Sequence, residues 1–156
     1  MAAGLQTIDH SALKVNQTGI VATVLVAFIG SFLSPAAWLL IPLLAIVLLV
    51  GTFAPRFALF KQLYFKVLKP AGIVKPTPVA DRPEPHNFAQ GMGGVVLAIA
   101  SLFLYLTTPA MGLAAAVGPA LSLIVAVLAF VNLAFGYCLG CQIYFQLGKR
   151  GLIRAQ

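Results

Sequence analysis

The sequence predicts an all-α, polytopic membrane protein with four transmembrane helices. The helices form two similarly oriented hairpins, each followed by a short amphipathic interfacial helix. Three observations predict this fold. The 156-residue chain is 61% hydrophobic and only 8% charged, against about 25% charged residues in a soluble domain. Its uncharged stretches are long enough to cross a bilayer, which takes about 20 residues. They also lack the period-2 alternation of transmembrane strands.

Four spans leave too little chain for a separate globular domain, so we expect a single integral membrane domain over residues 1–156. Pro35 can end the first span and begin the second, and the helix breakers of residues 107–112 separate the third from the fourth. A signal peptide is an alternative interpretation of the first span, because Lys14 precedes it and small residues follow it. The expected spans are about 17–33, 36–54, 89–107 and 113–135.

An internal repeat favours four equivalent spans over a signal peptide. Residues 62–65 (Gln-Leu-Tyr-Phe) match residues 142–145 (Gln-Ile-Tyr-Phe), and Lys69 matches Lys149, at a spacing of 80 residues. Coincidence between two aromatic-ended apolar helices is the alternative explanation. A true repeat would relate the two hairpins by a pseudo-two-fold axis along the membrane normal.

The basic residues predict the orientation, because neither hairpin tip carries a charge. The positive-inside rule places the charged side, with both termini and the linker of about residues 69–88, in the cytoplasm. We therefore expect a multi-pass protein of the bacterial inner (cytoplasmic) membrane. The net charge of +7 then reflects orientation and attraction to lipid headgroups rather than nucleic-acid binding. All the basic residues lie on this one side: Lys14, Arg56, Lys61, Lys66, Lys69, Lys75, Arg82, Lys149, Arg150 and Arg154.

A short in-plane helix is expected after each hairpin. Pro55 suits the first position of a new helix, and the residues after it alternate basic and aromatic side chains. After the fourth span the apolar character continues to Phe145, so the chain must bend, and Gly136 is the expected break.

The bend places Cys138 and Cys141 near the start of that last helix. Their i, i+3 spacing puts both sulfurs on one face, within reach of a disulfide or of one soft metal ion. A helix N-terminus lowers the pKa of a thiol, which makes the pair a candidate redox or ligand site. A structural disulfide is not expected on a cytoplasmic face. The alternative is that both cysteines simply pack as small apolar residues.

The proline-rich linker ends at the mouth of the third span, where we expect an extended strand. Two accounts of its polar residues remain open. In the first, Arg82 and Glu84 form a solvated pair and Asn87 caps the helix. In the second, the strand folds across the bundle mouth and brings His86 near the two cysteines. The candidate binding residues at this mouth are Arg82, Glu84, His86 and Gln90.

These motifs together resemble a family of uncharacterised bacterial four-span integral membrane proteins, classified as a domain of unknown function. The resemblance rests on Arg-x-Glu-Pro-x-x-Phe-Ala-Gln over residues 82–90 and on Gly-x-Cys-x-Gly-Cys over residues 136–141, and it covers about residues 10–150. It implies the four-span fold and the choice of motif residues, and it implies no reaction.

Three functions remain open. The first is a cytoplasm-facing thiol site for redox, sulfur or soft-metal handling, with Arg82 stabilising a thiolate. The second is a non-catalytic structural or assembly subunit, and the third is a small-solute permease. Whether the protein is an enzyme, and which cofactor or metal it uses, are unknown at this stage. The expected partners are membrane lipid and a protein partner or second copy of the chain, with no nucleic acid.

Overall fold

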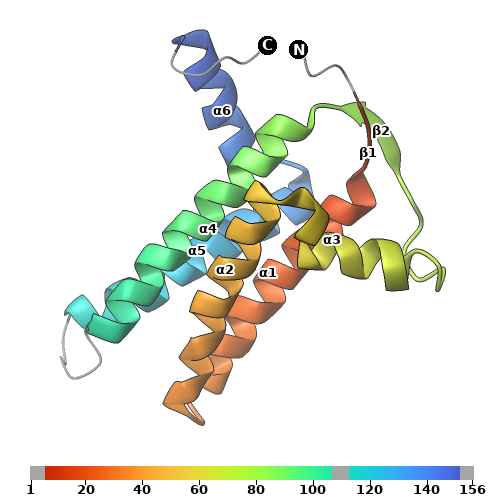
Figure 1. The fold of residues 1–156 in the computed structure, drawn as a ribbon. Coiled ribbons are helices and arrows are strands. Elements are labelled where there is room, and N and C mark those ends of the chain that lie inside the picture. Colours follow the sequence, from red (N-terminus) through yellow and green to blue (C-terminus); the bar gives the residue numbers. More distant parts are fainter. Residues whose placement is uncertain (1–5, 107–112, 152–156) are drawn as a thin grey trace.

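Four long apolar helices dominate the protein. The computed structural model describes residues 6–106 and 113–151 (Figure 1). The long helices are α1 (His10–Gly30), α2 (Leu40–Phe53) continuing the 3-10 turn η1 (Pro35–Leu39), α4 (Pro83–Leu106) and α5 (Leu113–Phe135). Each is long and apolar enough to cross a membrane. The predicted mostly helical fold with four such helices is therefore confirmed.

Two of these helices begin earlier than the sequence predicts. Helix α1 begins at His10 rather than near residue 17, because the Asp9 carboxylate caps it by accepting from the Ser11 N–H. Helix α4 begins at Pro83 rather than near residue 89. Proline is favoured in the first turn of a helix. Glu84, in the same turn, adds a negative charge that complements the helix dipole. The predicted extended strand is thus wrong from Pro83 onward, and Asn87 lies inside the helix instead of capping it.

The long helices pack through small residues and fully buried aliphatic side chains. Helix α4 is central, since it contacts α2, α5 and α6, while α1 contacts α2 and α5. A Cβ at Gly94 would lie 3.0 Å from Leu49, and one at Gly118 would lie 2.7 Å from Leu104. Glycine therefore lets α4 approach both neighbours closely. The core includes Val24, Ile41, Leu48, Leu97 and Ala100.

The hydroxyl groups within the long helices are satisfied locally. Ser101 donates to the Leu97 carbonyl, and Ser122 donates to the Gly118 carbonyl. Thr23 and Thr52 donate in the same i to i−4 pattern. These hydrogen bonds satisfy the groups inside an apolar bundle, so the hydroxyls are structural.

The outer surface of the bundle is apolar along the four long helices. Large aliphatic and aromatic side chains such as Val26, Ile46, Ile124 and Phe130 are each more than half exposed. An apolar surface this extensive is not stable against water, and it matches the lipid contact that four candidate spans require.

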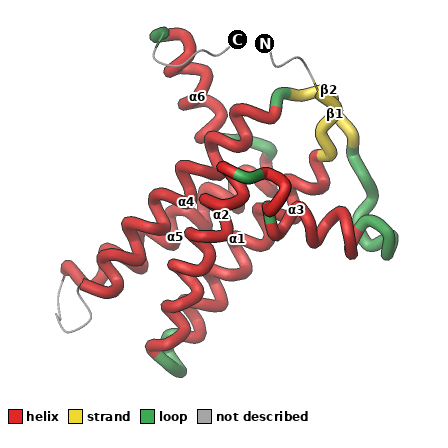
Figure 2. The backbone as a smooth tube through the Cα atoms, in the orientation of Figure 1, coloured by secondary structure: helices red, strands yellow, loops and turns green. Residues whose placement is uncertain are grey.

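A two-stranded ribbon lies at one end of the bundle, and the sequence did not predict it. Strand β1 (Gln6–Asp9) pairs antiparallel with β2 (Pro78–Asp81), so that Gln6 faces Asp81 and Asp9 faces Pro78. Figure 2 shows the ribbon at the opposite end from the turn that follows α1. The ribbon ties the start of α1 to the linker that leads into α4.

Asp9 anchors this ribbon to the segment after α2. Its Oδ2 accepts from the Tyr64 hydroxyl at 2.7 Å and lies 3.6 Å from Lys69 Nζ, while its Oδ1 accepts from the Thr77 N–H at 2.9 Å. Burial raises the pKa of Asp9, but the hydrogen bonds from Tyr64, Thr77 and Ser11 and the Lys69 charge outweigh it. The net result is a pKa below the usual value of 3.8.

Short helices follow both long pairs, as predicted. After α2 come the 3-10 turn η2 (Pro55–Phe57), α3 (Leu59–Leu63) and the π-helical turn η3 (Tyr64–Leu68). After α5 comes α6 (Leu139–Lys149). The basic residues, except Arg154 outside the described part, belong to these short helices, to the linker or to the first turns of α1. They gather at the ribbon end of the bundle (Figure 1).

We predict that Tyr64→Phe loosens the ribbon. The Tyr64 side chain is fully buried, and its hydroxyl donates to an ionised carboxylate. Losing that hydrogen bond should speed amide exchange across residues 6–9 and 78–81 roughly tenfold. Hydrogen exchange with mass spectrometry in nanodiscs measures this, with Tyr105→Phe as a control on α4. Equal protection in Tyr64→Phe and the wild type would contradict the anchoring role.

A second prediction concerns acid. Because the pKa of Asp9 is lower in the folded chain than its usual 3.8, the carboxylate stabilises the ribbon at all pH values above about 4. That contribution is lost as the pH falls through the lowered pKa. In the wild type, the protection of the ribbon amides from hydrogen exchange, corrected for the intrinsic exchange rate, should therefore fall at acid pH. In Asp9→Asn it should be weaker and independent of pH over the same range, and a matching acid loss in Asp9→Asn would refute the assignment.

Candidate functional site: a cysteine pair beside a histidine and a carboxylate

The chain bends sharply between α5 and α6, at the position the sequence predicts. Gly136 has a φ of +68°, in the left-handed region that glycine adopts without strain. Its N–H donates to the Asn132 carbonyl and closes the last turn of α5. Two residues later Cys138 caps α6, with its Sγ accepting from the Cys141 N–H at 3.2 Å.

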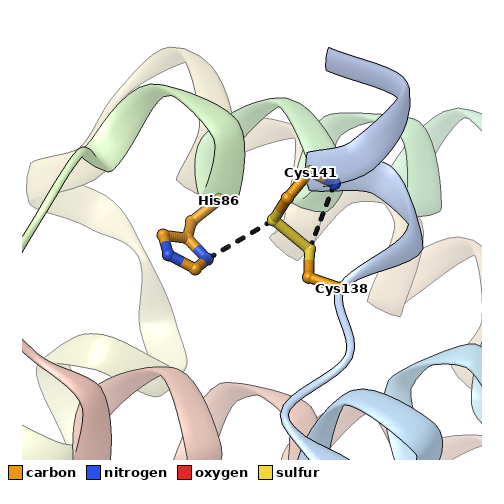
Figure 3. Close-up of side chains that lie close together, drawn as sticks. All are labelled: His86, Cys138 and Cys141. Carbon is orange, nitrogen blue, oxygen red and sulfur yellow. Dashed lines mark hydrogen bonds between the residues drawn. A yellow bond between two sulfur atoms is a disulfide. The ribbon is translucent and has the colours of Figure 1, made fainter. Parts of the chain in front are cut away.

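Cys138 and Cys141 are joined in a disulfide (Figure 3). A structural disulfide is not expected on a cytoplasmic face, where thiols are kept reduced. The i, i+3 spacing across the first turn of α6 nevertheless brings the two Cα atoms to 5.2 Å, within the usual range for bonded cysteines. Cys141 is 8% exposed, whereas Cys138 is only partly buried. Cys138 is therefore the more accessible sulfur to a reagent from outside.

His86 lies against the buried sulfur. Its Nδ1 is 3.7 Å from Cys141 Sγ, and Figure 3 shows the ring on α4 facing the disulfide. Its other nitrogen, Nε2, lies 2.9 Å from Asp81 Oδ2. A carboxylate accepts the Nε2 proton, which leaves the Nδ1 lone pair of the neutral ring directed at the sulfur. The Asp81 carboxylate, the His86 imidazole and the Cys141 sulfur therefore form a chain of successive contacts.

Asp81 joins this histidine to a second one. Its Oδ2 also lies 3.2 Å from His10 Nε2, at the start of α1, and the His10 and His86 rings meet edge to face at 6.0 Å. Burial raises the pKa of Asp81, but the hydrogen bonds from His86, the Arg82 N–H and His10 outweigh it. The pKa is therefore below its usual 3.8. Asp81 stays ionised at neutral pH and can stabilise a positive charge on His86.

Close packing between α4 and α6 fixes this geometry. A Cβ at Gly140 would lie 2.5 Å from the Ala89 Cβ and 2.8 Å from its Cα. The Phe88 and Tyr144 rings, one on each helix, contact each other at 5.5 Å between centroids. Gly140 is thus required for the approach of the two helices, which explains a glycine inside the Cys-x-x-Cys motif.

An open cavity of about 510 Å³ lies over the disulfide. Its lining includes His10, Asp81, His86 and both cysteines, together with Tyr137, Phe145 and Lys149. A cavity of this size accommodates a peptide segment or a small thiol next to Cys138.

The remaining predicted mouth residues have different surroundings. Gln90 is 9% exposed, and its Nε2 donates to the Leu48 carbonyl, so it joins α4 to α2 within the bundle. The Arg82 N–H donates to Asp81 Oδ1. Glu84 lies in the first turn of α4. Among the described residues, neither Arg82 nor Glu84 lines the cavity. A role for Arg82 in stabilising a thiolate stays a prediction.

His10 and Asp81 belong to the site, although the sequence analysis did not select them for it. They come from opposite ends of the ribbon segment, 71 residues apart in the chain. The signal that could have found them is the pair of short segments, each ending in an aspartate, that precede α1 and α4. Antiparallel pairing sets Asp9 opposite Pro78 and Asp81 opposite Gln6, and the His10 side chain then reaches the Asp81 carboxylate. A weak β pattern of four residues did not reveal this pairing.

The same side chains offer two sets of metal donors. One ligand atom from each of His86, Cys138 and Cys141 lies within 4.8 Å of the others, and the same holds for His10, Asp81 and His86. The disulfide removes the thiolates that a soft metal requires, so the first set could hold an ion only after reduction.

The fold and site define a helical membrane protein of four candidate spans with a Cys-x-x-Cys pair at a helix start. Residues 8–149 match the family described as a domain of unknown function, DUF4395. The chain belongs to that family, which confirms the predicted resemblance to a domain of unknown function over most of the chain. No curated protein and no solved structure matches the chain.

We predict that Gly140→Ala separates α6 from α4. The added methyl overlaps Ala89, and such overpacking costs about 1–3 kcal/mol. In a Cys138→Ser background the free Cys141 thiol should then react with a maleimide several times faster than in the parent. Gly93→Ala is the matched control, since its Cβ would make only ordinary contacts at 3.8 Å. Equal labelling rates in all three proteins would rule out this packing role.

Proposed function

We propose that the protein is a membrane-embedded thiol–disulfide exchange protein whose reacting groups are Cys138 and Cys141. One observation carries the proposal: a disulfide in the first turn of α6, with an imidazole held against the Cys141 sulfur and an open cavity lined by both cysteines. Helix N-termini and adjacent cationic groups are the surroundings that make cysteines reactive. A disulfide that only stabilises a fold has no need of them.

The orientation of the site is part of the proposal. The basic residues of the short helices and the linker lie at the same end of the bundle as the disulfide. The positive-inside rule therefore supports a site at the cytoplasmic surface of a bacterial inner membrane, within a single membrane domain. The partner is then a reduced protein dithiol or a small thiol from the cytoplasm.

Cys138 is the sulfur that the partner attacks, because it is the more accessible of the two. An incoming thiolate forms a bond to Cys138 Sγ as the Cys138–Cys141 bond breaks, and the electron pair goes to Cys141. Protonated His86 supplies a proton from Nδ1 to the Cys141 thiolate, 3.7 Å away, while Asp81 stabilises the charged ring beforehand.

A second partner thiol then attacks the mixed disulfide and releases Cys138 as a thiolate. The Cys141 N–H, which already contacts Cys138 Sγ, stabilises this leaving group together with the helix dipole. The partner dithiol has been oxidised to a disulfide and the Cys138–Cys141 pair has been reduced to a dithiol. In the reverse direction His86 accepts the Cys141 proton as a general base.

The first experiment asks which cysteine exchanges. Cys141→Ser, treated with oxidised glutathione, should accumulate a mixed disulfide on Cys138, read by intact-mass spectrometry. Cys138→Ser should react at least about tenfold more slowly, because its remaining thiol is buried. Equal reaction of the two variants, or none in either, would contradict the assignment of Cys138 as the attacked sulfur.

The second experiment tests the histidine. His86→Gln should slow the reduction of the disulfide by a dithiol at least about tenfold near neutral pH, since general acid catalysis commonly contributes more than that. Stopped-flow measurements against pH should also show the loss of one ionisation. Glu84→Gln, two residues earlier on α4, is the control and should leave the rate unchanged. A wild-type rate and pH profile in His86→Gln would exclude the proton transfer.

A further inference from the structure

A second, smaller cavity also borders the cysteine pair. Its volume is about 160 Å³, and it is enclosed by α1, α4, α5 and α6 with Leu48 of α2. Cys138 and His86 therefore border both the open cavity and this second cavity, which is lined mainly by aliphatic side chains.

Two lining residues of the second cavity are also among the exposed apolar side chains of α5. They are Ile124 and Leu128, at 53% and 42% exposed. Most of the other lining side chains are aliphatic, such as Ile20 and Val96. A ligand entering from the bilayer would reach Cys138 without passing through water.

Three side-chain amides that line this cavity, those of Asn16, Gln17 and Asn132, make no hydrogen bond to another side chain or backbone group of the described ranges. Asn16 is the most buried of the three, at 8% exposed. No buried side-chain nitrogen or oxygen of the described residues lacks a partner, so the Asn16 amide keeps access to the cavity and can donate to a ligand that offers a hydrogen-bonding oxygen.

We propose that this cavity binds the head group of a lipid-soluble quinone, which accepts two electrons from the Cys138–Cys141 dithiol. A quinone is an apolar ring with carbonyl oxygens, so it matches both the aliphatic walls and the Asn16 amide donor. A phospholipid acyl chain would fill the walls but leave the amide unpaired. This inference rests on the proposed function, because the thiol exchange supplies the dithiol.

The reaction balances as a two-electron, two-proton transfer. The Cys138–Cys141 bond forms as the two S–H bonds are lost, and the quinone carbonyls become the two hydroxyls of a quinol. The Asn16 N–H stabilises the oxygen on which negative charge develops, and His86 takes the Cys141 proton. A partner dithiol in the open cavity then restores the protein dithiol, so electrons pass from a water-soluble thiol to the membrane.

The test uses the full chain in quinone-free nanodiscs, reduced and freed of reductant. The probe is decylubiquinone, whose ring is fully substituted and so cannot add thiols. Quinol absorbance and thiol loss should appear together, one quinol for each disulfide. Asn16→Leu should slow quinol formation about tenfold, as should Ile124→Trp, which fills the cavity. Val127→Trp is the matched control on α5, since it is exposed to lipid and does not line the cavity, and it should match the wild type.

Glutathione exchange in the same preparations distinguishes the two proposals. Intact exchange without quinol formation above the buffer rate would overturn the quinone site alone. Equal quinol rates in all three variants and the wild type would overturn it too, because oxidation would then occur outside the cavity. Loss of exchange in the wild type would overturn the proposed function and this inference with it.

Discussion

The Asp81 carboxylate is the interaction on which the arrangement of the site depends. Its Oδ2 contacts both His10, at the start of α1, and His86, in the first turn of α4. Asp81 itself is held by the pairing of β2 with β1. One ionised group therefore fixes the entry of two long helices and the tautomer of the imidazole that faces the sulfur. Without it, the start of α1 and the start of α4 would lose the carboxylate that joins their two histidines across 71 residues of chain.

The membrane fold and the chemistry are coupled through helix packing. Glycines at 94 and 118 let α4 sit close to its neighbours, and Gly140 lets α6 dock on the same helix beside Ala89. The reactive pair is thus built on rigid helices rather than on a free loop. The first turn of α6 supplies the Cys141 N–H to Cys138 Sγ, and this amide favours a thiolate at Cys138.

Much of this could be predicted from the sequence, because long uncharged runs and helix breakers specify spans and bends. The four long helices, the break at Gly136 and the short helices after each pair were predicted correctly. The starts of α1 and α4 were predicted too late, because an apolar pattern does not detect a polar first turn capped by Asp9 or begun by Pro83. The ribbon was missed because a four-residue pairing depends on contacts across 71 residues, and with it the roles of Asp81 and His10 in the site.

The most direct test of the central claim is the reduction potential of the Cys138–Cys141 pair in a lipid bilayer. Equilibration against graded dithiothreitol or glutathione buffers, followed by trapping of free thiols, measures it. We expect a single reversible two-electron transition above about −300 mV, within the range where cellular thiols can exchange with it. A pair that stays joined well below that potential would be a structural disulfide, and the exchange account would be wrong.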